Sequence, residues 1–425
     1  MTLNRRQFLT RSGLGVAGAA AGAVTGLALP ARGAIDADAS APSPVDGGPS
    51  APNGPTLGPV AFHGPHQAGI LDAAQACAIF ATFDVVTSSR TELADVMKTL
   101  TSRARWLTSG GIPANLAVSV PPSDSGTLGP IVPPDGLTIT TAVSSTLFDD
   151  DRFGLGAVRP ARLKPMLAFP NDDLDPAWLG GDLLLQIGGG EPDVVAHALR
   201  DLAKHTRGAL ALRWKINGFV SPARPDGRGR NHLGFKDGIA NPAVDETSVA
   251  DQLLWVLGRG DEPAWTKGGS YQVCRLIRTY IEFWDRVSLS EQQGMFGRFR
   301  DTGIVLGSSN PDAYPDYADD PHGRVIPLTS HIRLANPRTP ATEPSQIYRR
   351  SFNYDLGVDL NGNLDVGSVF NCFQQDLVRQ FEVVQGRLLN EALADYIAPF
   401  GGGYFFALPG VIDNDDWYLR GALTA

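Results

Sequence analysis

Cysteine is scarce in this sequence. The 425 residues include only three cysteines, Cys77, Cys274 and Cys372, and none of them belongs to a CxxC pair. This excludes a disulfide framework and a zinc site built from paired cysteines. One disulfide among the three is left open, because the sequence does not say which pair would form it.

Basic charge is also limited. The chain has 36 Lys and Arg against 45 Asp and Glu, a net charge of -9, and contains no block of Lys or Arg. A field of this sign repels a phosphate backbone, so we expect no nucleic acid partner. Cationic or neutral small molecules suit the overall charge better, although a local basic patch stays open.

No hydrophobic run is long enough to cross a membrane. The longest uncharged stretch near the N-terminus, residues 13–29, consists mostly of Ala and Gly. It is shorter and less hydrophobic than the ~20 apolar residues that a spanning helix needs. We therefore expect no stable membrane insertion.

The residues around this stretch resemble a twin-arginine signal peptide. Arg5 and Arg6 are followed, after one residue, by Phe8 and Leu9 and then by the weakly apolar run. The resemblance predicts a signal peptide over residues 1–39 that is recognised by the twin-arginine translocase. The mature protein would then be periplasmic or extracellular. Because this route carries folded proteins, it also points to a cofactor inserted before export.

The mature chain is predicted to begin with a linker. Residues 40–56 are rich in Ala, Pro, Ser and Gly and show no apolar periodicity, which is typical of disorder. Small residues at 31–33 and at 37–39 leave the cleavage point open. The rest of the chain exceeds the size at which one core usually stops growing, so two domains or one duplicated domain are expected.

Apolar periodicity predicts a strand and then a helix in the first part of the folded chain. Residues 78–86 form a β-branched and aromatic run of strand length. Ser89, with Glu92 three residues later, predicts a capping box at the start of the helix.

A second strand and helix follow at residues 182–187 and from Pro192 onward. Three glycines, Gly188 to Gly190, separate them and invite a nucleotide-site interpretation. The third glycine of GxGxxG would fall at Asp193, however, so we interpret the segment as a plain turn.

Further strands are predicted at residues 209–214, 271–281 and 404–408, the last of them after Gly401 to Gly403. Strands and helices therefore interleave without the regular rhythm of a parallel sheet. This favours an α+β fold with antiparallel sheets.

The segment at residues 230–242 carries the most informative motif. It reads RNHLGFKDGIANP and places Asp237 between Lys236 and Gly238. On its own, Asp-Gly followed by Asn-Pro is a signal for a surface turn.

Several motifs in the same order resemble the dye-decolourising peroxidase family. GFKDGIANP is similar to the GxxDG motif of that family, and the likeness runs from about Gly58 to the C-terminus. The signal peptide narrows it to the twin-arginine-exported branch, which includes deferrochelatase/peroxidases. Ile239 departs from the pattern, where threonine is expected. The other matching segments are HQAGI at 66–70, DEPAW at 261–265, GGSY at 268–271, SHIR at 330–333, NPR at 336–338, YRRS at 348–351 and IAPFGGGYFFALPG at 397–410.

This resemblance implies duplicated ferredoxin-like domains, an N-terminal one over residues 57–217 and a C-terminal one over residues 218–425. It also implies one non-covalent haem b per chain, held mainly by the C-terminal domain, with His331 as the iron ligand. Independently, peroxidase iron needs a neutral imidazole, and the chain has only seven histidines. His331 is the one in an apolar, strand-like context.

The same resemblance assigns the opposite side of the haem to Asp237 and Arg349. Moving a proton between peroxide oxygens needs a base, and the departing hydroxide needs a cation. Arg350 is the rival of Arg349, but adjacent residues of a strand point to opposite faces. Gly238 and Asn241 are expected beside the cofactor.

A ligating histidine normally donates its second ring N–H to a carboxylate or carbonyl. Two acids, Glu391 and Asp395, precede the segment that begins at Ile397. Asp395 is preferred here, and Glu391 is the alternative.

The favoured function is a haem peroxidase that reduces hydrogen peroxide with electrons from dyes, phenols or similar one-electron donors. The alternatives are a haem-binding or iron-releasing deferrochelatase, in which peroxidase activity is incidental, and a chlorite-decomposing haem enzyme. Trp265, Trp284 and Tyr354 are candidates for electron transfer, but core packing explains them better. The sequence leaves open whether the chain forms a homo-oligomer.

Overall fold

The computed structural model describes residues 57–224 and 227–425. The predicted signal peptide and linker, residues 1–39 and 40–56, lie outside the described residues. These described residues belong to one compact unit. Within the described ranges, no helix is long and apolar enough to cross a membrane.

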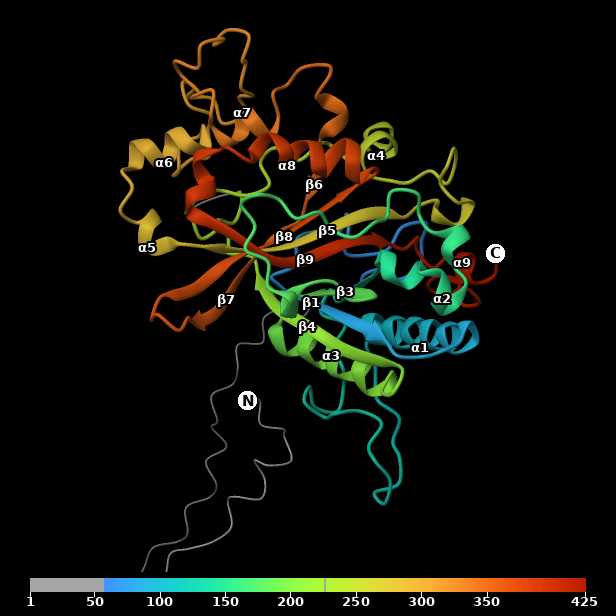
Figure 1. The fold of residues 1–425 in the computed structure, drawn as a ribbon. Helices are drawn as coiled ribbons and strands as arrows, with labels where there is room; N and C mark the ends of the chain where they lie inside the picture. Colours follow the sequence, from blue (N-terminus) through green and yellow to red (C-terminus); the bar gives the residue numbers. More distant parts are fainter. Residues whose placement is uncertain (1–56, 225–226) are drawn as a thin grey trace, which may run out of the picture. The chain divides into compact units, whose positions relative to one another are not determined.

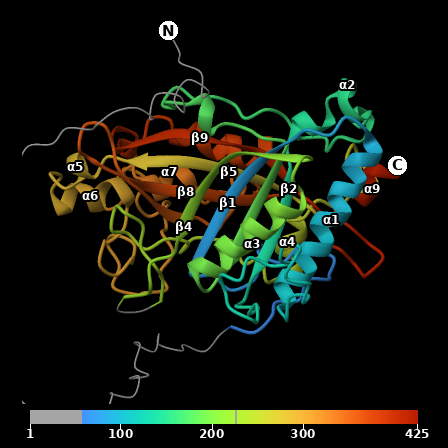
Figure 2. The ribbon, with the colours of Figure 1, turned by 90° about the horizontal axis from the view of Figure 1, so that it is seen from below.

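The N-terminal half contains four strands and two long helices. Two of the strands flank the central pair, and the antiparallel order is β2-β3-β1-β4. Figures 1 and 2 show both helices covering one face of this sheet. The elements are β1 (Cys77–Val85), α1 (Arg90–Ser109), β2 (Thr138–Val143), β3 (Leu183–Gly189), α3 (Pro192–His205) and β4 (Leu210–Phe219).

The C-terminal half repeats this arrangement, with strand order β9-β5-β8-β7 and the short β6 on β8. In Figure 1, α6, α7 and α8 lie above these strands. The elements are β5 (Ser270–Thr279), α5 (Ile281–Trp284), α6 (Leu289–Phe296), α7 (His331–Ala335), β6 (Tyr348–Arg349), β7 (Phe352–Val358), β8 (Leu364–Gln374), a π-helix (Leu377–Glu382), α8 (Val383–Leu388) and β9 (Ile397–Ala407).

The equivalent strand order in both halves confirms the duplicated ferredoxin-like fold. Short connections complete it: α2 (Asp150–Phe153), α4 (Thr247–Leu253), α9 (Arg420–Leu423) and 3-10 turns at Ser145–Phe148, Gly156–Val158, Pro176–Trp178, Ala264–Thr266, Glu343–Ser345 and Ala392–Tyr396. Strand β4 runs to Phe219, two residues past the domain boundary expected at 217/218.

Short stretches of strand pairing join the two four-stranded sheets at both edges. β2 meets β9 at Ala142 and Val143, and β4 meets β7 at Phe219. Both faces of each sheet are buried. Phe80 and Leu276 pack between the two sheets, whereas Ile79 packs on the opposite face of its sheet. This explains why these strands read as continuous apolar runs.

Most of the predicted elements are confirmed, including the capping box in which Ser89 and Glu92 bond each other's backbone N–H. Two expectations differ. Gly401 to Gly403 lie inside β9, because their backbone continues the pairing with β5. His331 begins a helix, α7, rather than lying in a strand. The three cysteines are free and buried.

Candidate active site

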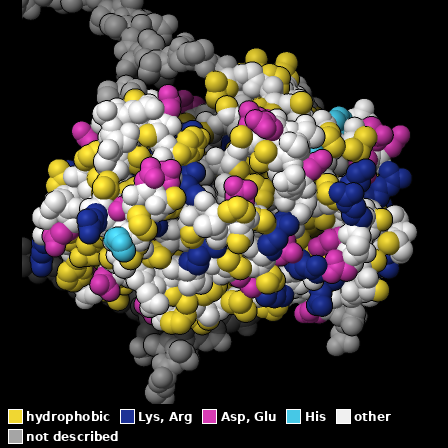
Figure 3. Space-filling view, turned by 90° about the horizontal axis from the view of Figure 1, so that it is seen from above, with side chains coloured by type: hydrophobic (Ala, Val, Ile, Leu, Met, Phe, Trp, Pro, Cys, Tyr) yellow, Lys and Arg dark blue, Asp and Glu magenta, His cyan; other side chains and the backbone are white. Residues whose placement is uncertain are grey.

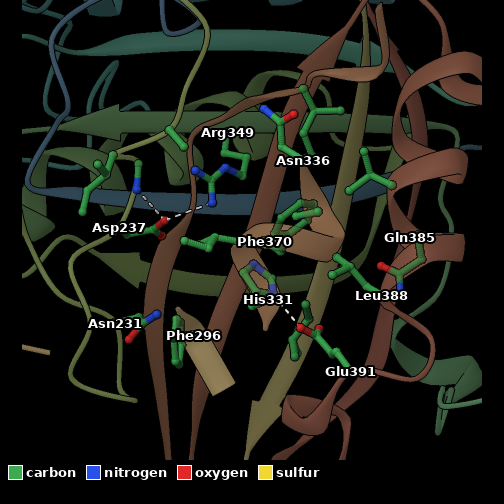
Figure 4. Close-up of a pocket in the computed structure, with 18 of the residues that line it drawn as sticks. Asn231, Asp237, Phe296, His331, Asn336, Arg349, Phe370, Gln385, Leu388 and Glu391 are labelled. Carbon is green, nitrogen blue, oxygen red and sulfur yellow. Dashed lines mark hydrogen bonds and ion pairs between the residues drawn. The ribbon is translucent and has the colours of Figure 1, made fainter. Parts of the chain in front are cut away.

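A cavity lies between β5, β8 and β9 and the helices above them (Figure 4). Its walls are largely apolar, and its lining also includes His331, Asp237 and Arg349. The apolar lining residues are Ile239, Ala240, Ile277, Phe296, Ile332, Ala335, Ile347, Phe370, Phe381, Val384, Leu388, Ile397 and Pro399.

His331 is the first residue of α7, and its side chain is 27% exposed. Its Nδ1 lies 2.6 Å from Oε2 of Glu391, whose side chain is only 6% exposed. A carboxylate accepts, so Nδ1 carries the hydrogen, and in the neutral ring the lone pair is then on Nε2. That is the state in which an imidazole binds a metal.

The preference for Asp395 as the partner of His331 is wrong. Asp395 is exposed and does not line the cavity, whereas Glu391 is buried and does. Glu391 immediately precedes the 3-10 turn Ala392–Tyr396, which places Asp395 away from α7.

The loop that carries Asp237 is a tight turn pinned at its base. Asn231 accepts the backbone N–H groups of Gly234 and Phe235, and Gly234 takes φ +87°, which glycine adopts without strain. The Phe235 ring stacks on Phe296 with centroids 3.7 Å apart. The loop is thereby fixed against a residue that also lines the cavity.

Asp237 and Arg349 form a pair at one part of the cavity, apart from His331 (Figure 4). Nη1 of Arg349 lies 3.7 Å from Oδ1 of Asp237, and the two side chains are 25% and 40% exposed. The same Oδ1 accepts the N–H of Gly238 at 2.6 Å. The carboxylate is thus oriented while it keeps access to solvent and to the cavity.

Asn241 holds the backbone of Arg349 rather than lining the cavity. Its Nδ2 donates to the carbonyl of Arg349 at 2.7 Å, and its Oδ1 accepts the Arg349 N–H at 3.1 Å. Gly238 lines the cavity and Asn241 does not, so the expected place of Asn241 beside the cofactor stays a prediction.

Arg349 and Arg350 point in different directions, as expected. The Arg350 guanidinium is buried and donates to the carbonyls of Ile70, Asp72 and Ala73. Strand β6 ends at Arg349, and Arg350 lies between β6 and β7. Of these two arginines, Arg349 lines the cavity and Arg350 does not.

Three further arginines, Arg275, Arg298 and Arg338, line the cavity, and the sequence patterns gave none of them a role. Burial lowers the pKa of Arg275 and of Arg298, because it penalises the charged form. Buried N–H groups of Arg275 and Arg338 have no partner among the described residues. A large anionic ligand in the cavity would satisfy them.

These features fit haem. Its flat apolar ring suits the apolar walls, its carboxylates suit the unpartnered arginine N–H groups, and His331 offers the imidazole. Over residues 57–224 and 227–425, no group of three or more His, Cys, Asp or Glu could hold a metal ion.

Three other histidines, and the three aromatic residues considered for electron transfer, have partners of their own. His197 lies 2.6 Å from Asp124, His66 stacks on Trp255, and His232 lies 3.0 Å from the carbonyl of Tyr354. Trp284 and Tyr354 are core residues, and Trp265 packs against a core cluster.

Two models, one for each domain of a single protein family, match the chain. Residues 67–220 match "Dyp-type peroxidase, N-terminal" and residues 228–412 match "Dyp-type peroxidase, C-terminal". A protein named Deferrochelatase from Escherichia coli (strain K12) is 49% identical over 358 residues, which cover 83% of this chain and 84% of that protein.

Solved structures are similar as well. A DyP-type peroxidase from Cellulomonas bogoriensis has a TM-score of 0.77 and 32% identity, with 88% of this chain and 100% of that chain covered. Ferric DtpA from Streptomyces lividans has a TM-score of 0.77 and 30% identity, with 87% and 98% covered. The chain belongs to the Dyp-type peroxidase family.

Proposed function

We propose that His331 is the protein ligand of the haem iron in this peroxidase, and that Asp237 and Arg349 act on hydrogen peroxide. When bound, haem b supplies an iron centre that exchanges electrons with peroxide and with one-electron donors. The observation that carries the proposal is the occurrence of both pairs, His331 with Glu391 and Asp237 with Arg349, in one cavity.

Each side chain would have one task. The hydrogen bond from Nδ1 to Glu391 orients the ring of His331 and makes it a stronger electron donor. The Asp237 carboxylate accepts the proton of the inner peroxide oxygen and passes it to the outer oxygen. The Arg349 guanidinium stabilises the negative charge that develops as the O–O bond lengthens.

The proposal for His331 is tested by His331→Ala, with His232→Ala and His322→Ala as matched controls. We expect the first variant to lose most of its bound haem and the controls to keep it, measured by the haem-to-protein absorbance ratio after purification. Full occupancy and an unchanged ferric spectrum in His331→Ala would contradict the assignment.

We also propose export by the twin-arginine translocase to the periplasm or beyond the cell. The support is the sequence around Arg5 and Arg6. Changing both to lysine should leave a folded, haem-loaded precursor in the cytoplasm, detected by fractionation and the haem spectrum. Export at the normal rate would contradict this.

Iron release from haem is the second candidate function, because a relative of 49% identity is named Deferrochelatase. The two functions differ in their product. Iron release would leave an intact metal-free porphyrin, seen by its fluorescence, whereas peroxidase turnover consumes donor and peroxide with the haem retained.

A further inference from the structure

Asp237 and Arg349 come from distant segments of the chain, and their side chains face each other in the cavity (Figure 4). Oδ1 of Asp237 and Nη1 of Arg349 are 3.7 Å apart, and both side chains are partly exposed. A partly exposed ion pair contributes little to stability, so it does not fix its own geometry. The distance between these two side chains must therefore be set by contacts of the backbone that carries them.

The surface above the cavity offers no substitute for accurate placement of these groups. Figure 3 shows this face, seen from above in the orientation of Figure 1, and acidic, basic and apolar side chains are interspersed on it. A surface of mixed sign produces no strong field of one sign, and hydrogen peroxide is neutral in any case. The reaction with peroxide therefore depends on how the groups inside the cavity are placed.

Arg349 lies in the two-residue strand β6, which is the last strand in the order of the sheet. On one side, β6 pairs with β8, with Tyr348 opposite Phe373 and Arg349 opposite Cys372. On the other side, Oδ1 of Asn241 accepts the Arg349 N–H at 3.1 Å, and Nδ2 of Asn241 donates to the Arg349 carbonyl at 2.7 Å. One residue thus exchanges both backbone bonds with one partner, as in a hydrogen-bonded pair of antiparallel strands. The Asn241 side chain takes the place of a neighbouring strand at this edge.

Asn241 is itself held in the loop that carries Asp237. Pro242 follows it, and the residue before a proline is restricted to extended backbone. The Asn241 N–H donates to the carbonyl of Gly238 at 3.4 Å, and the Gly238 N–H donates to Oδ1 of Asp237 at 2.6 Å. A short series of hydrogen bonds therefore connects the carboxylate of Asp237 with the backbone of Arg349.

The two bonds of Asn241 are the direct link between this loop and β6. Within residues 57–224 and 227–425, no other hydrogen bond joins residues 237–242 to β6. The start of the loop is tied to β7 instead, because Nδ2 of Asn353 donates to the carbonyl of Arg230 at 2.8 Å. That contact fixes the base of the loop without involving Arg349.

We propose that Asn241 is a positioning residue for the reaction with peroxide. Its amide holds the backbone of Arg349 so that the guanidinium and the Asp237 carboxylate reach the same peroxide molecule. Asn241 does not line the haem cavity, so it acts through Arg349 and not on the peroxide itself. The inference rests on the proposed roles of Asp237 and Arg349 and deepens them. Such an effect can be large, because a misplacement of about 1 Å can slow a reaction by ~100-fold.

The first test is hydrogen exchange of the Arg349 amide in the haem-loaded protein, which needs no peroxide. Asn241→Ala removes both bonds, so exchange of the Arg349 N–H should become about tenfold faster or more. Asn353→Ala is the matched control, because it removes a bond at the base of the same loop, and it should leave this N–H as in wild type. Unchanged exchange in Asn241→Ala, or equal acceleration in both variants, would overturn the proposal.

Asn241→Asp keeps the size of the side chain and serves if Asn241→Ala does not fold. A carboxylate still accepts the Arg349 N–H but has no hydrogen for the Arg349 carbonyl. The N–H should therefore stay protected, while the reaction with peroxide still slows by about threefold or more. A wild-type rate in this variant would contradict a positioning role for the bond to the carbonyl.

The second test asks whether Asn241 acts through Arg349. The donor-free reaction with peroxide is followed by stopped-flow haem absorbance in wild type, Asn241→Ala, Arg349→Leu and the double variant. Asn241→Ala should slow the reaction about tenfold in the wild-type background but less than about twofold in the Arg349→Leu background, because residues that act as a unit are not additive. The same fold-loss in both backgrounds would overturn the proposal, since a general structural defect or a separate route would act in both.

These outcomes also separate this inference from the proposed function. If Arg349→Leu reacts with peroxide as fast as wild type, the proposed role of Arg349 is wrong, and hydrogen exchange still tests its link to Asn241. If Arg349→Leu is slow and Asn241→Ala reacts as wild type, the proposed function stands and the positioning role of Asn241 is wrong.

Discussion

Glu391 accepts a hydrogen bond from His331 across 60 residues of sequence, with Nδ1 and Oε2 2.6 Å apart. The carboxylate is nearly inaccessible to solvent, whereas the imidazole remains open to the cavity. This contact fixes which ring nitrogen faces a cofactor, because a carboxylate requires the hydrogen on Nδ1.

Replacing Glu391 by Gln should weaken haem binding by about 10-fold to 100-fold, since a carboxylate partner raises the basicity of the ligating imidazole. The measurement is the rate of haem transfer to apomyoglobin. Asp395→Asn is the matched control, and it should behave like wild type because Asp395 is exposed. Greater haem loss in Asp395→Asn than in Glu391→Gln would restore the preference drawn from sequence.

Arg349→Leu should slow the donor-free reaction with peroxide by about 100-fold or more, as expected when one strong transition-state donor is lost. Arg350→Met should slow it far less but lower thermal stability, because several buried carbonyls lose their donor. Stopped-flow haem absorbance and a melting curve measure the two effects. The reverse order of rates would show that Arg350, not Arg349, serves the peroxide.

Asp237→Asn should slow the same reaction by about 10²-fold to 10⁴-fold, because an amide cannot accept the peroxide proton. Asn241→Asp is a useful comparison, since it removes the donor to the Arg349 carbonyl without touching Asp237. Equal rates in wild type and Asp237→Asn would assign Asp237 to a structural or access role.

The buried ion pair between Arg275 and Asp172 should stabilise the wall of the haem cavity. Both side chains are almost fully buried, so Asp172→Asn leaves an uncompensated charge and should cost about 3 to 5 kcal/mol of unfolding free energy. The double variant Asp172→Leu with Arg275→Met should recover much of this. Denaturant unfolding measures both, and an additive loss in the double variant would argue against the pairing.

The stability of the fold should fall as pH decreases below about 6.5, in part through His66. Burial lowers the pKa of His66, although its bond to the Gly268 carbonyl acts in the other direction. The unfolded chain therefore binds a proton at a pH where the folded chain does not. The contribution of neutral His66 to the free energy of unfolding is complete above the pKa that His66 has in the unfolded chain. It is lost as the pH falls through the pKa that His66 has in the folded chain.

His66→Phe keeps a ring against Trp255 but removes the titrating group. Its unfolding free energy should therefore depend less steeply on pH than that of wild type between pH 7 and the acidic range. Parallel curves for the two proteins, measured by denaturant unfolding at several pH values, would show that His66 does not contribute.

Local sequence patterns correctly predicted the features that depend only on residues close together in the chain. The capping box of Ser89 and Glu92 depends only on backbone groups within one turn, and it forms as predicted. The opposite directions of Arg349 and Arg350 follow from the geometry of an extended chain, and this also holds. His331 was identified as the candidate ligand, but its helix was missed because five residues carry too short a period.

The sequence by itself therefore predicted the antiparallel α+β fold and the family, and it singled out Asp237, His331 and Arg349, which the structure brings to one cavity. Only the tertiary structure decided between Glu391 and Asp395, because the direction of each carboxylate depends on how one 3-10 turn packs against α7. It also gathered arginines from β5, β6 and distant loops around one cavity. Such groupings arise from sheet pairing between residues far apart in the chain, and no local spacing encodes them.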